Sequence, residues 1–221
     1  MIFSKEFAIK FYPKYIDLFE RLNNNVLFHK TIKSVQCKQI YGDYNDYLNT
    51  FIKNEISDRP IDYLEFGVYG GRRIKQWIEL NKHPDSRFFG FDTFTGLPEE
   101  FQKNHPKGKF NVNGQLPVIN DKRVKFIKGL FQETLDNFLK QFTKNTDSIL
   151  VIHLDADLYS STLYCLTKLD HLLRDSFVMF DEFGDLQHEF AAFYDYTHSY
   201  YRKYTILYRH SNWRHLIIRI N

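Results

Sequence analysis

Four short apolar segments of this 221-residue chain end in acidic side chains, and two of them carry more than one acid. Asp155 ends one segment with Asp157 two residues beyond it, and Asp181 ends another with Glu182 directly behind. The ends of neighbouring parallel strands lie about 5 Å apart, so Asp155, Asp181 and Glu182 would converge on one point. Three carboxylates suit Mg²⁺ or a similar divalent cation. In the alternative interpretation these acids only cap strands and helix N-termini, as Asp157 is also placed to do.

The remaining two acids stand next to glycines. Glu65 precedes Gly67 and Gly70 in a strand-to-helix connection, and Asp92 ends the following apolar segment. Glycines let the backbone pass close beneath a ligand, and a carboxylate on the adjoining strand can accept hydrogen bonds from both hydroxyls of a ribose. Together they indicate a nucleotide-like ligand without separating NAD from S-adenosylmethionine. A tight turn with no ligand is the alternative for the glycines alone.

Two weaker signals accompany these acids. A fifth apolar segment, the third in chain order, ends at Gly129, followed by Leu130 and Phe131, which could pass beside an adenine ring or form a plain turn. His153 lies two residues before Asp155, so it faces the same side of its strand at a deeper level. We expect a hydrogen-bonded core histidine there.

The elements that would position these residues alternate from residue 61 onward, which is typical of β-α-β units around a buried parallel sheet. The expected strands are 61–66, 87–92, 123–128, 148–155 and 176–181. The expected helices are 72–80, 132–142, 160–173 and 186–201. Two further apolar stretches, 203–208 and 213–220, predict an antiparallel hairpin. The fold class is therefore α/β, with a doubly wound, Rossmann-like sheet; by fold analogy, the terminal hairpin is characteristic of its class I methyltransferase variant.

The regions outside this alternation are the N-terminus and one long connection. Residues 1–58 show apolar positions at three- and four-residue steps, interrupted at 23–25, and predict a helical cap. Residues 59–221 would form the ligand-binding domain. The stretch 93–120 holds three prolines and three glycines with little periodicity, so we expect a long loop that closes over the site as a lid.

Composition narrows the function classes. With 43% hydrophobic and 26% charged residues the chain is a folded protein, and its net charge of +3 comes without a basic block that could track nucleic acid. Cys37 and Cys165 lack disulfide-framework or zinc spacing, which favours a reducing, cytoplasmic setting. Charged residues interrupt the N-terminal apolar positions, and no apolar run approaches the roughly 20 residues of a membrane span. We expect a soluble, untargeted protein. The sequence leaves the oligomeric state open, a homo-oligomer included.

Four longer strings contain most of the residues named so far. In order they are LEFGVYGG at 64–71, GFDTFTGLPE at 90–99, KGLFQETL at 128–135 and LDADLYSST at 154–162. Together they resemble the macrocin O-methyltransferase family. The second and fourth strings are much more specific than the glycine loop. The resemblance covers residues from about 61 to 190 and leaves the N-terminal region outside.

This resemblance implies a class I S-adenosylmethionine-dependent enzyme that methylates a hydroxyl of a sugar, glycoside or related small natural product with the help of Mg²⁺. The implied cofactor site comprises Glu65, Gly67, Tyr69, Gly70, Asp92, Thr93, Gly129, Leu130 and Phe131. Within it, the methionine part would lie near Glu65 and the glycines, the ribose at Asp92 and the adenine beside 129–131. The implied metal ligands are Asp155, Asp181 and Glu182.

The chain departs from the family pattern at two places in this site. Family members usually carry a small hydroxyl residue where this chain has Arg73, and paired aspartates where it has Asp181 and Glu182. An alcohol is a poor nucleophile at neutral pH, so methyl transfer to it also needs a base. Asp155 or Asp157, at the same edge of the sheet, is the candidate.

Two other functions compete with this one. Asp155-Ala156-Asp157 matches the metal-binding D-x-D pattern of a glycosyltransferase that uses a nucleotide-sugar, although that function leaves the Glu65 and Gly67 loop unexplained. A binding module of the same fold, whose acids are only caps, is the third interpretation.

Overall fold

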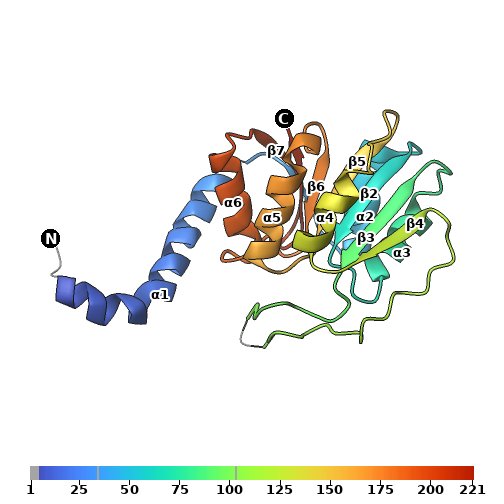
Figure 1. The fold of residues 1–221 in the computed structure, drawn as a ribbon. Coiled ribbons are helices and arrows are strands. Elements are labelled where there is room, and N and C mark those ends of the chain that lie inside the picture. The colour runs from blue at the N-terminus through green and yellow to red at the C-terminus, as the bar shows by residue number, and fades with distance from the viewer. Residues whose placement is uncertain (1–4, 34, 103) are drawn as a thin grey trace.

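The computed structural model describes residues 5–33, 35–102 and 104–221. Within them the chain forms one eight-stranded mixed sheet in the order β1-β7-β8-β6-β5-β2-β3-β4 (Figure 1). The strands are β1 (Lys38–Ile40), β2 (Ile61–Phe66), β3 (Arg87–Asp92), β4 (Val124–Lys128), β5 (Ile149–Leu154), β6 (Phe177–Phe180), β7 (Tyr204–His210) and β8 (Leu216–Ile220).

Strands β4, β3, β2, β5 and β6 run parallel, whereas β8 pairs antiparallel with both β6 and β7. The chain builds outward from β2 to β4 and then returns to place β5 on the other side of β2. This reversal opens a crevice at the carboxyl ends of β2 and β5, where ligands of such sheets bind. The predicted doubly wound sheet with its terminal hairpin is confirmed, and the predicted bounds of β2 and β3 match the structure.

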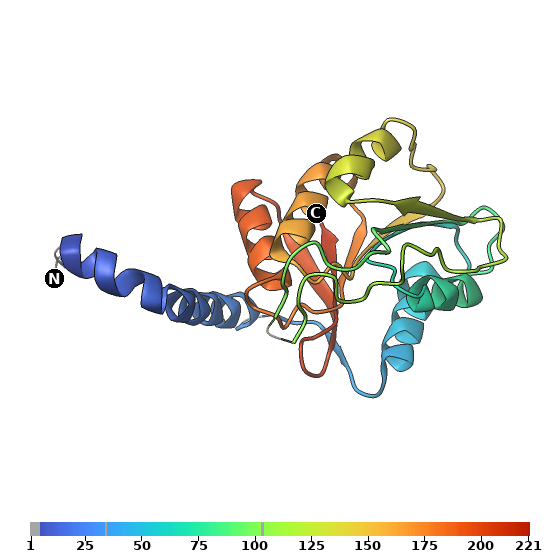
Figure 2. The same ribbon diagram turned by 60° about the horizontal axis from the view of Figure 1, so that its bottom comes forward.

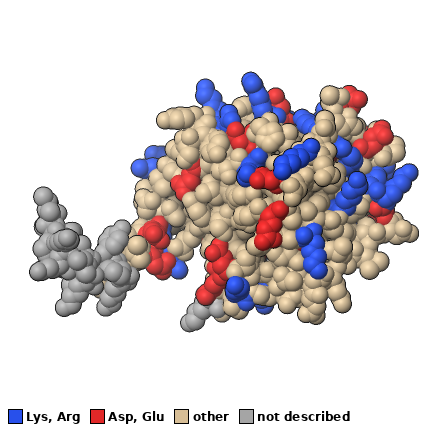
Figure 3. All heavy atoms as spheres, viewed as in Figure 1, with Lys and Arg blue, Asp and Glu red and all other residues tan. Residues whose placement is uncertain are grey.

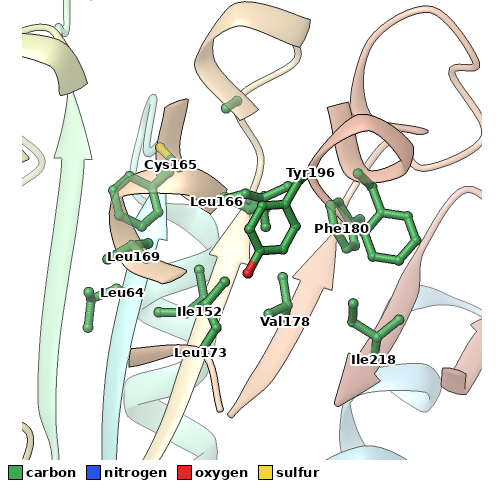
Figure 4. Close-up of a cluster of buried hydrophobic side chains, with 14 of the residues drawn as sticks. Leu64, Ile152, Cys165, Leu166, Leu169, Leu173, Val178, Phe180, Tyr196 and Ile218 are labelled. Carbon is green, nitrogen blue, oxygen red and sulfur yellow. The ribbon is translucent and has the colours of Figure 1, made fainter. Parts of the chain in front are cut away.

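Helices cover both faces of the sheet, which explains why its central strands are apolar throughout rather than alternating. One face carries α4 (Phe131–Leu139), α5 (Tyr159–Leu169), the short 3₁₀-helix η2 (Asp170–Leu172) and α6 (Glu189–Ser199). Its core joins strand residues such as Leu64, Ile152 and Val178 to Leu166 of α5 and Tyr196 of α6 (Figure 4). The opposite face carries α3 (Arg72–Leu80) and part of the N-terminal region.

The N-terminal region forms helices, as predicted, but the break expected at residues 23–25 is wrong. Helix α1 (Lys5–Ile32) runs through the asparagines without interruption and projects away from the rest of the molecule (Figures 1 and 2). Helix propensity is a weak prior, and apolar side chains on both sides of the asparagines keep the helical pattern. At the end of α1 Phe28 packs edge-on against Phe190, with ring centroids 5.2 Å apart. None of the helices in the described residues combines the length and apolar character needed to cross a bilayer.

The residues that follow α1 are part of the folded domain. Strand β1 pairs in parallel with β7 at the sheet edge, a feature too short for its periodicity to be seen in the sequence. Helix α2 (Tyr44–Phe51) begins with a capping box at Asp43 and continues into the π-helix η1 (Ile52–Ile56). Phe51 is fully buried against Trp77, Phe177 and Tyr208. The boundary at residue 58 stays a prediction, but α2 and η1 pack as part of the sheet's covering layer.

The predicted long loop is confirmed. Residues 93–102 and 104–120 contain only turns and an isolated bridge between Gln102 and His105, and the loop crosses the carboxyl edge of the sheet (Figure 2). Its middle contacts the α5–α6 side through a hydrogen bond from Gln102 Nε2 to Asp185 Oδ2 of 2.6 Å. Lysine, arginine and acidic side chains are interspersed over the face shown in Figure 3, without an extended area of one sign.

Replacing Phe51 by Ala tests whether α2 is part of the cooperative core. Loss of this fully buried ring leaves a cavity between α2, α3 and the sheet, so the free energy of unfolding should fall by about 3–5 kcal/mol in urea denaturation. Phe19→Ala on α1, where the residue is 56% exposed, is the matched control and should change stability by less than about 0.5 kcal/mol. A drop for Phe51→Ala no larger than that of the control would contradict the packing described.

Candidate active site

A cavity of about 260 Å³ opens at the carboxyl edge of the sheet, between the ends of β2 and β3 on one side and β5 and β6 on the other. The predicted site residues that line it are Gly67, Tyr69, Asp92, Thr93, Leu130, Phe131, Asp155, Asp157, Asp181 and Glu182. Glu65, Gly70 and Gly129 are not among the lining residues. The loop contributes Gly96, Leu97, Pro98 and Phe110, and the hairpin turn contributes Arg214.

Gly67 lets the ends of β2 and β5 meet. Its φ is +96°, and a Cβ built on it would lie 1.8 Å from the carbonyl oxygen of Asp155. Two backbone hydrogen bonds of 2.9 Å, Gly67 N to Phe91 O and Asp155 N to Phe66 O, tie the three strand ends together. Only glycine fits this position, since any side chain would push the Asp155 backbone out of the cavity floor.

Asp92 organises the two loops beside it. Its Oδ2 accepts hydrogen bonds from the amides of Val68 (2.8 Å) and Tyr69 (2.7 Å), and its Oδ1 accepts one from the amide of Phe94 (2.7 Å). A carboxylate has about four acceptor positions, so one remains for a ligand in the cavity. Asp92 can therefore still make the predicted contact with a ribose, in addition to holding the two loops.

Glu65 lies beneath the cavity rather than in its wall. It is fully buried, its Oε2 accepts a 2.7 Å hydrogen bond from Tyr63 Oη, and its Oε1 has no partner in the described part of the chain. Burial raises the pKa of Glu65 to about 8, against the lowering effects of Tyr63 and Arg73. At neutral pH this carboxyl is therefore largely protonated.

The structure brings two of the predicted metal ligands together with a histidine. Ligand atoms of His153, Asp155 and Asp181 all lie within 4.8 Å of one another. The predicted core role of His153 is confirmed, because it is buried and its Nδ1 lies 2.7 Å from Tyr63 Oη. Its Nε2 lies 3.9 Å from Asp181 Oδ1, so the same ring also reaches the acidic pair.

The two carboxyls of this cluster are held in different states. Although burial acts in the opposite direction, the nearby His153 and His215 rings keep the pKa of Asp181 well below its usual range. Burial and the negative charge of Asp181 raise the pKa of Asp155 well above its usual range. Two buried carboxylates this close cannot both stay ionised without a cation between them.

Glu182 and Asp157 lie on the outer side of the cluster. The Glu182 carboxylate forms an ion pair with Arg214 of the hairpin turn, and its backbone amide donates to Glu189 Oε2 at 2.9 Å. Glu182 is therefore not one of the converging ligands, and its role in metal binding stays a prediction. Burial and the charge of Glu182 raise the pKa of Asp157 to about 7.

Three residues of the site were not anticipated in these roles. His215 Nδ1 lies 3.3 Å from Asp181 Oδ1, Arg73 Nη2 lies 3.5 Å from the same oxygen, and Glu189 is fully buried behind Glu182. His215 reaches the site because β8 pairs antiparallel with β6, which brings the start of β8 beside the end of β6. This contact cannot be predicted from the sequence pattern, because the pattern does not give the register between β8 and β6.

Two comparisons with known proteins find a methyltransferase family and an O-methyltransferase. The family model described as Macrocin-O-methyltransferase (TylF) matches residues 38–204. A curated relative from Streptomyces olivaceus, 8-demethyl-8-(2,3-dimethoxy-alpha-L-rhamnosyl)-tetracenomycin-C 4′-O-methyltransferase, is 30% identical, and the match covers 67% of this chain and 65% of that protein. The matched part is thus just under two thirds of the relative's length.

Two solved structures are also similar. The O-methyltransferase from Bacillus cereus in complex with SAH has a TM-score of 0.48 and 12% identity, covering 89% of each chain. The pyocyanin biosynthetic protein PhzM has a TM-score of 0.43 and 12% identity, covering 80% of this chain and 55% of that one.

Glu65→Gln should change the pH dependence of stability. The folded-state pKa of Glu65, about 8, lies above its ordinary value of 4.5, so the unfolded chain releases this proton first as pH rises. Folding therefore loses stability between about pH 4.5 and 8. Glutamine stays neutral, so the variant should gain stability over wild type at pH 8 and little at pH 5, by at most about 5 kcal/mol.

Urea denaturation of both proteins at pH 5 and pH 8 measures this difference. Glu79→Gln is the matched control, because the Glu79 side chain is 74% exposed, and its effect should be the same at both pH values. An equal effect of Glu65→Gln at the two pH values would contradict the raised pKa.

Proposed function

This chain belongs to the macrocin-O-methyltransferase (TylF) family, and from that premise we propose that it is an S-adenosylmethionine-dependent O-methyltransferase. Its acceptor in this proposal is a hydroxyl of a sugar, glycoside or related small natural product, and a divalent cation such as Mg²⁺ assists the reaction. The observation that carries the proposal is the single cavity that joins the Asp92 turn to the acidic cluster of His153, Asp155 and Asp181.

The β2–β3 side of the cavity suits the cofactor. Leu130 and Phe131 supply an apolar wall for a flat base, and Asp92 keeps an acceptor position for a ribose hydroxyl. Tyr69 and Thr93 flank the same side. These contacts match a ligand with one apolar aromatic part and one hydroxyl-rich part.

The β5–β6 side of the cavity suits a hydroxyl-bearing acceptor. Asp157, Glu182 and Arg214 offer hydrogen-bonding groups of both signs. Phe110 of the 93–120 loop, whose ring centroid lies 5.7 Å from that of Tyr69, adds an aromatic face next to the cofactor side. The relative from Streptomyces olivaceus is named for methylating a position of a rhamnosyl glycoside. A deoxysugar attached to an apolar body is therefore the acceptor class that we propose.

The acidic cluster fits a divalent cation. His153, Asp155 and Asp181 are close enough to share one ion, and the buried like charges of the two aspartates need a cation or a proton between them. These three residues would hold the metal in our proposal. When bound, such an ion would stabilise the negative charge that develops on the acceptor oxygen.

Positioning and proton removal fall to the chain's own residues. Methyl transfer requires the acceptor oxygen, the methyl carbon and the sulfonium sulfur in line, and holding them so supplies much of the rate. Asp157 faces the cavity with a pKa of about 7, close to the optimum for a general base at neutral pH. Asp155 has a more strongly raised pKa and lies in the cluster, so we assign the base to Asp157.

The glycosyltransferase alternative receives no support from an independent observation. Asp155-Ala156-Asp157 forms part of the cavity, but Asp157 itself has a left-handed backbone with φ of +57° and lies outside the cluster formed by Asp155. The family match also favours methyl transfer.

Isothermal titration calorimetry with S-adenosylhomocysteine tests the cofactor. Wild-type protein should bind, and Asp92→Asn should weaken binding at least about tenfold, because the amide nitrogen cannot accept the bonds that order both loops. Asp147→Asn, at an exposed residue on the opposite end of β5, is the control and should bind like wild type. Absence of wild-type binding at millimolar ligand would refute the proposal.

Asp157→Asn tests the base. Asparagine tolerates the left-handed backbone at this position, so the fold and the affinity for S-adenosylhomocysteine should be retained. With S-adenosylmethionine and a rhamnosyl glycoside, kcat should fall by about 10²–10⁴-fold. The wild-type rate should rise with pH through an apparent pKa of about 7, because the base acts in its ionised form.

The variant should lose that rise, and Asp147→Asn should keep it. A variant with full activity would exclude Asp157 as the base. Absence of methyl transfer by the wild-type protein would instead favour the binding-module interpretation.

A further inference from the structure

Arg73 is a buried cation at the edge of the acidic cluster. It lies in the first turn of α3 and is only 9% exposed. Its Cζ stands 3.3 Å from the ring centroid of Tyr44 on α2, and its Nη2 stands 3.5 Å from Asp181 Oδ1. A guanidinium stacked on an aromatic ring in a buried site is held firmly.

The contacts of Asp181 fall on one of its two oxygens. Arg73 Nη2, His215 Nδ1 and His153 Nε2 lie 3.5, 3.3 and 3.9 Å from Oδ1. Asp181 also lines the cavity, whereas Arg73 does not. Arg73 therefore contacts Asp181 from the protein side without entering the cavity, so the same carboxylate can meet a cation on the cavity side.

We propose that Arg73 is a built-in counter-ion of Asp181 that lowers the affinity of the His153, Asp155 and Asp181 cluster for divalent cations. The inference rests on the metal site of the proposed function. A fixed positive charge beside a ligand oxygen repels an incoming cation and offsets part of the negative charge that would attract it. In a buried site this repulsion is poorly screened by solvent.

The contact between Arg73 and Asp181 also stabilises the position of Asp181 before a cation binds. With Arg73 in place, the Asp181 carboxylate is held by a contact from the protein side before any metal arrives, so the cavity does not need the ion to keep Asp181 in position. Arg73 is thus a positioning residue for Asp181. The site is expected to exchange its cation readily rather than to retain it through purification.

The test is direct binding of Mn²⁺ alone to the full-length protein, followed by the electron paramagnetic resonance signal of free Mn²⁺. Arg73→Gln and Arg73→Met each remove the charge, and both should bind Mn²⁺ about tenfold more tightly than wild type. Two neutral variants of different polarity guard against one of them failing to fold. Arg73→Lys keeps the charge and should stay within about threefold of wild type.

Lys75→Gln is the matched control, since Lys75 is an exposed cation on the same helix, and it should also stay within about threefold of wild type. Unchanged or weaker Mn²⁺ binding in both neutral variants, or no Mn²⁺ binding in any protein, would overturn the inference. Calorimetry with S-adenosylhomocysteine on the same samples tests the proposed function separately. Cofactor binding with no gain in Mn²⁺ affinity would reject only the role of Arg73.

Discussion

The structure depends on neutralising several carboxyl groups that the fold gathers at one buried edge of a parallel sheet. Like charges in a site of low polarity cannot all remain ionised without partners. The carboxyl groups are neutralised in different ways. Asp92 is held by three backbone amides, Asp181 by two histidines and Arg73, and Glu182 by Arg214. Glu65 and Asp155 instead have pKa values raised by burial.

This division of charge states is what makes the edge useful. Carboxyls at the centre are kept neutral or paired, whereas the lining acid Asp157 has a pKa of about 7 and can exchange protons near neutral pH. The strand ends also have to stay in contact for the groups to remain in register. Gly67 permits that contact, and the two layers of buried aromatic and aliphatic side chains fix the strands that carry it.

The sequence was sufficient for the parts that depend on local pattern. Apolar runs ending in acids predicted β2, β3 and the common edge at which Asp92, Asp155 and Asp181 lie, and the terminal hairpin followed from its β-branched stretches. Contacts set by register could not be predicted in this way. The contacts of His215 and Arg73 with Asp181 can be predicted only from the register between β8 and β6 and from the position of α3 against the sheet. Strand β1 was missed because three residues are too few for a period.

The attachment of the 93–120 loop has a consequence for how such a protein can diversify. The loop rests at its middle on Asp185 through Gln102, and Phe101 packs against His188 with ring centroids 4.6 Å apart. Phe94 at the start of the loop is buried and its amide holds Asp92, whereas positions such as Val118, which is 91% exposed, lie away from the strand ends. Substitutions at such exposed loop positions can therefore change which acceptor molecules reach the cavity, while the strand-end residues stay in place. A change in selectivity of this kind does not require a loss of folding stability.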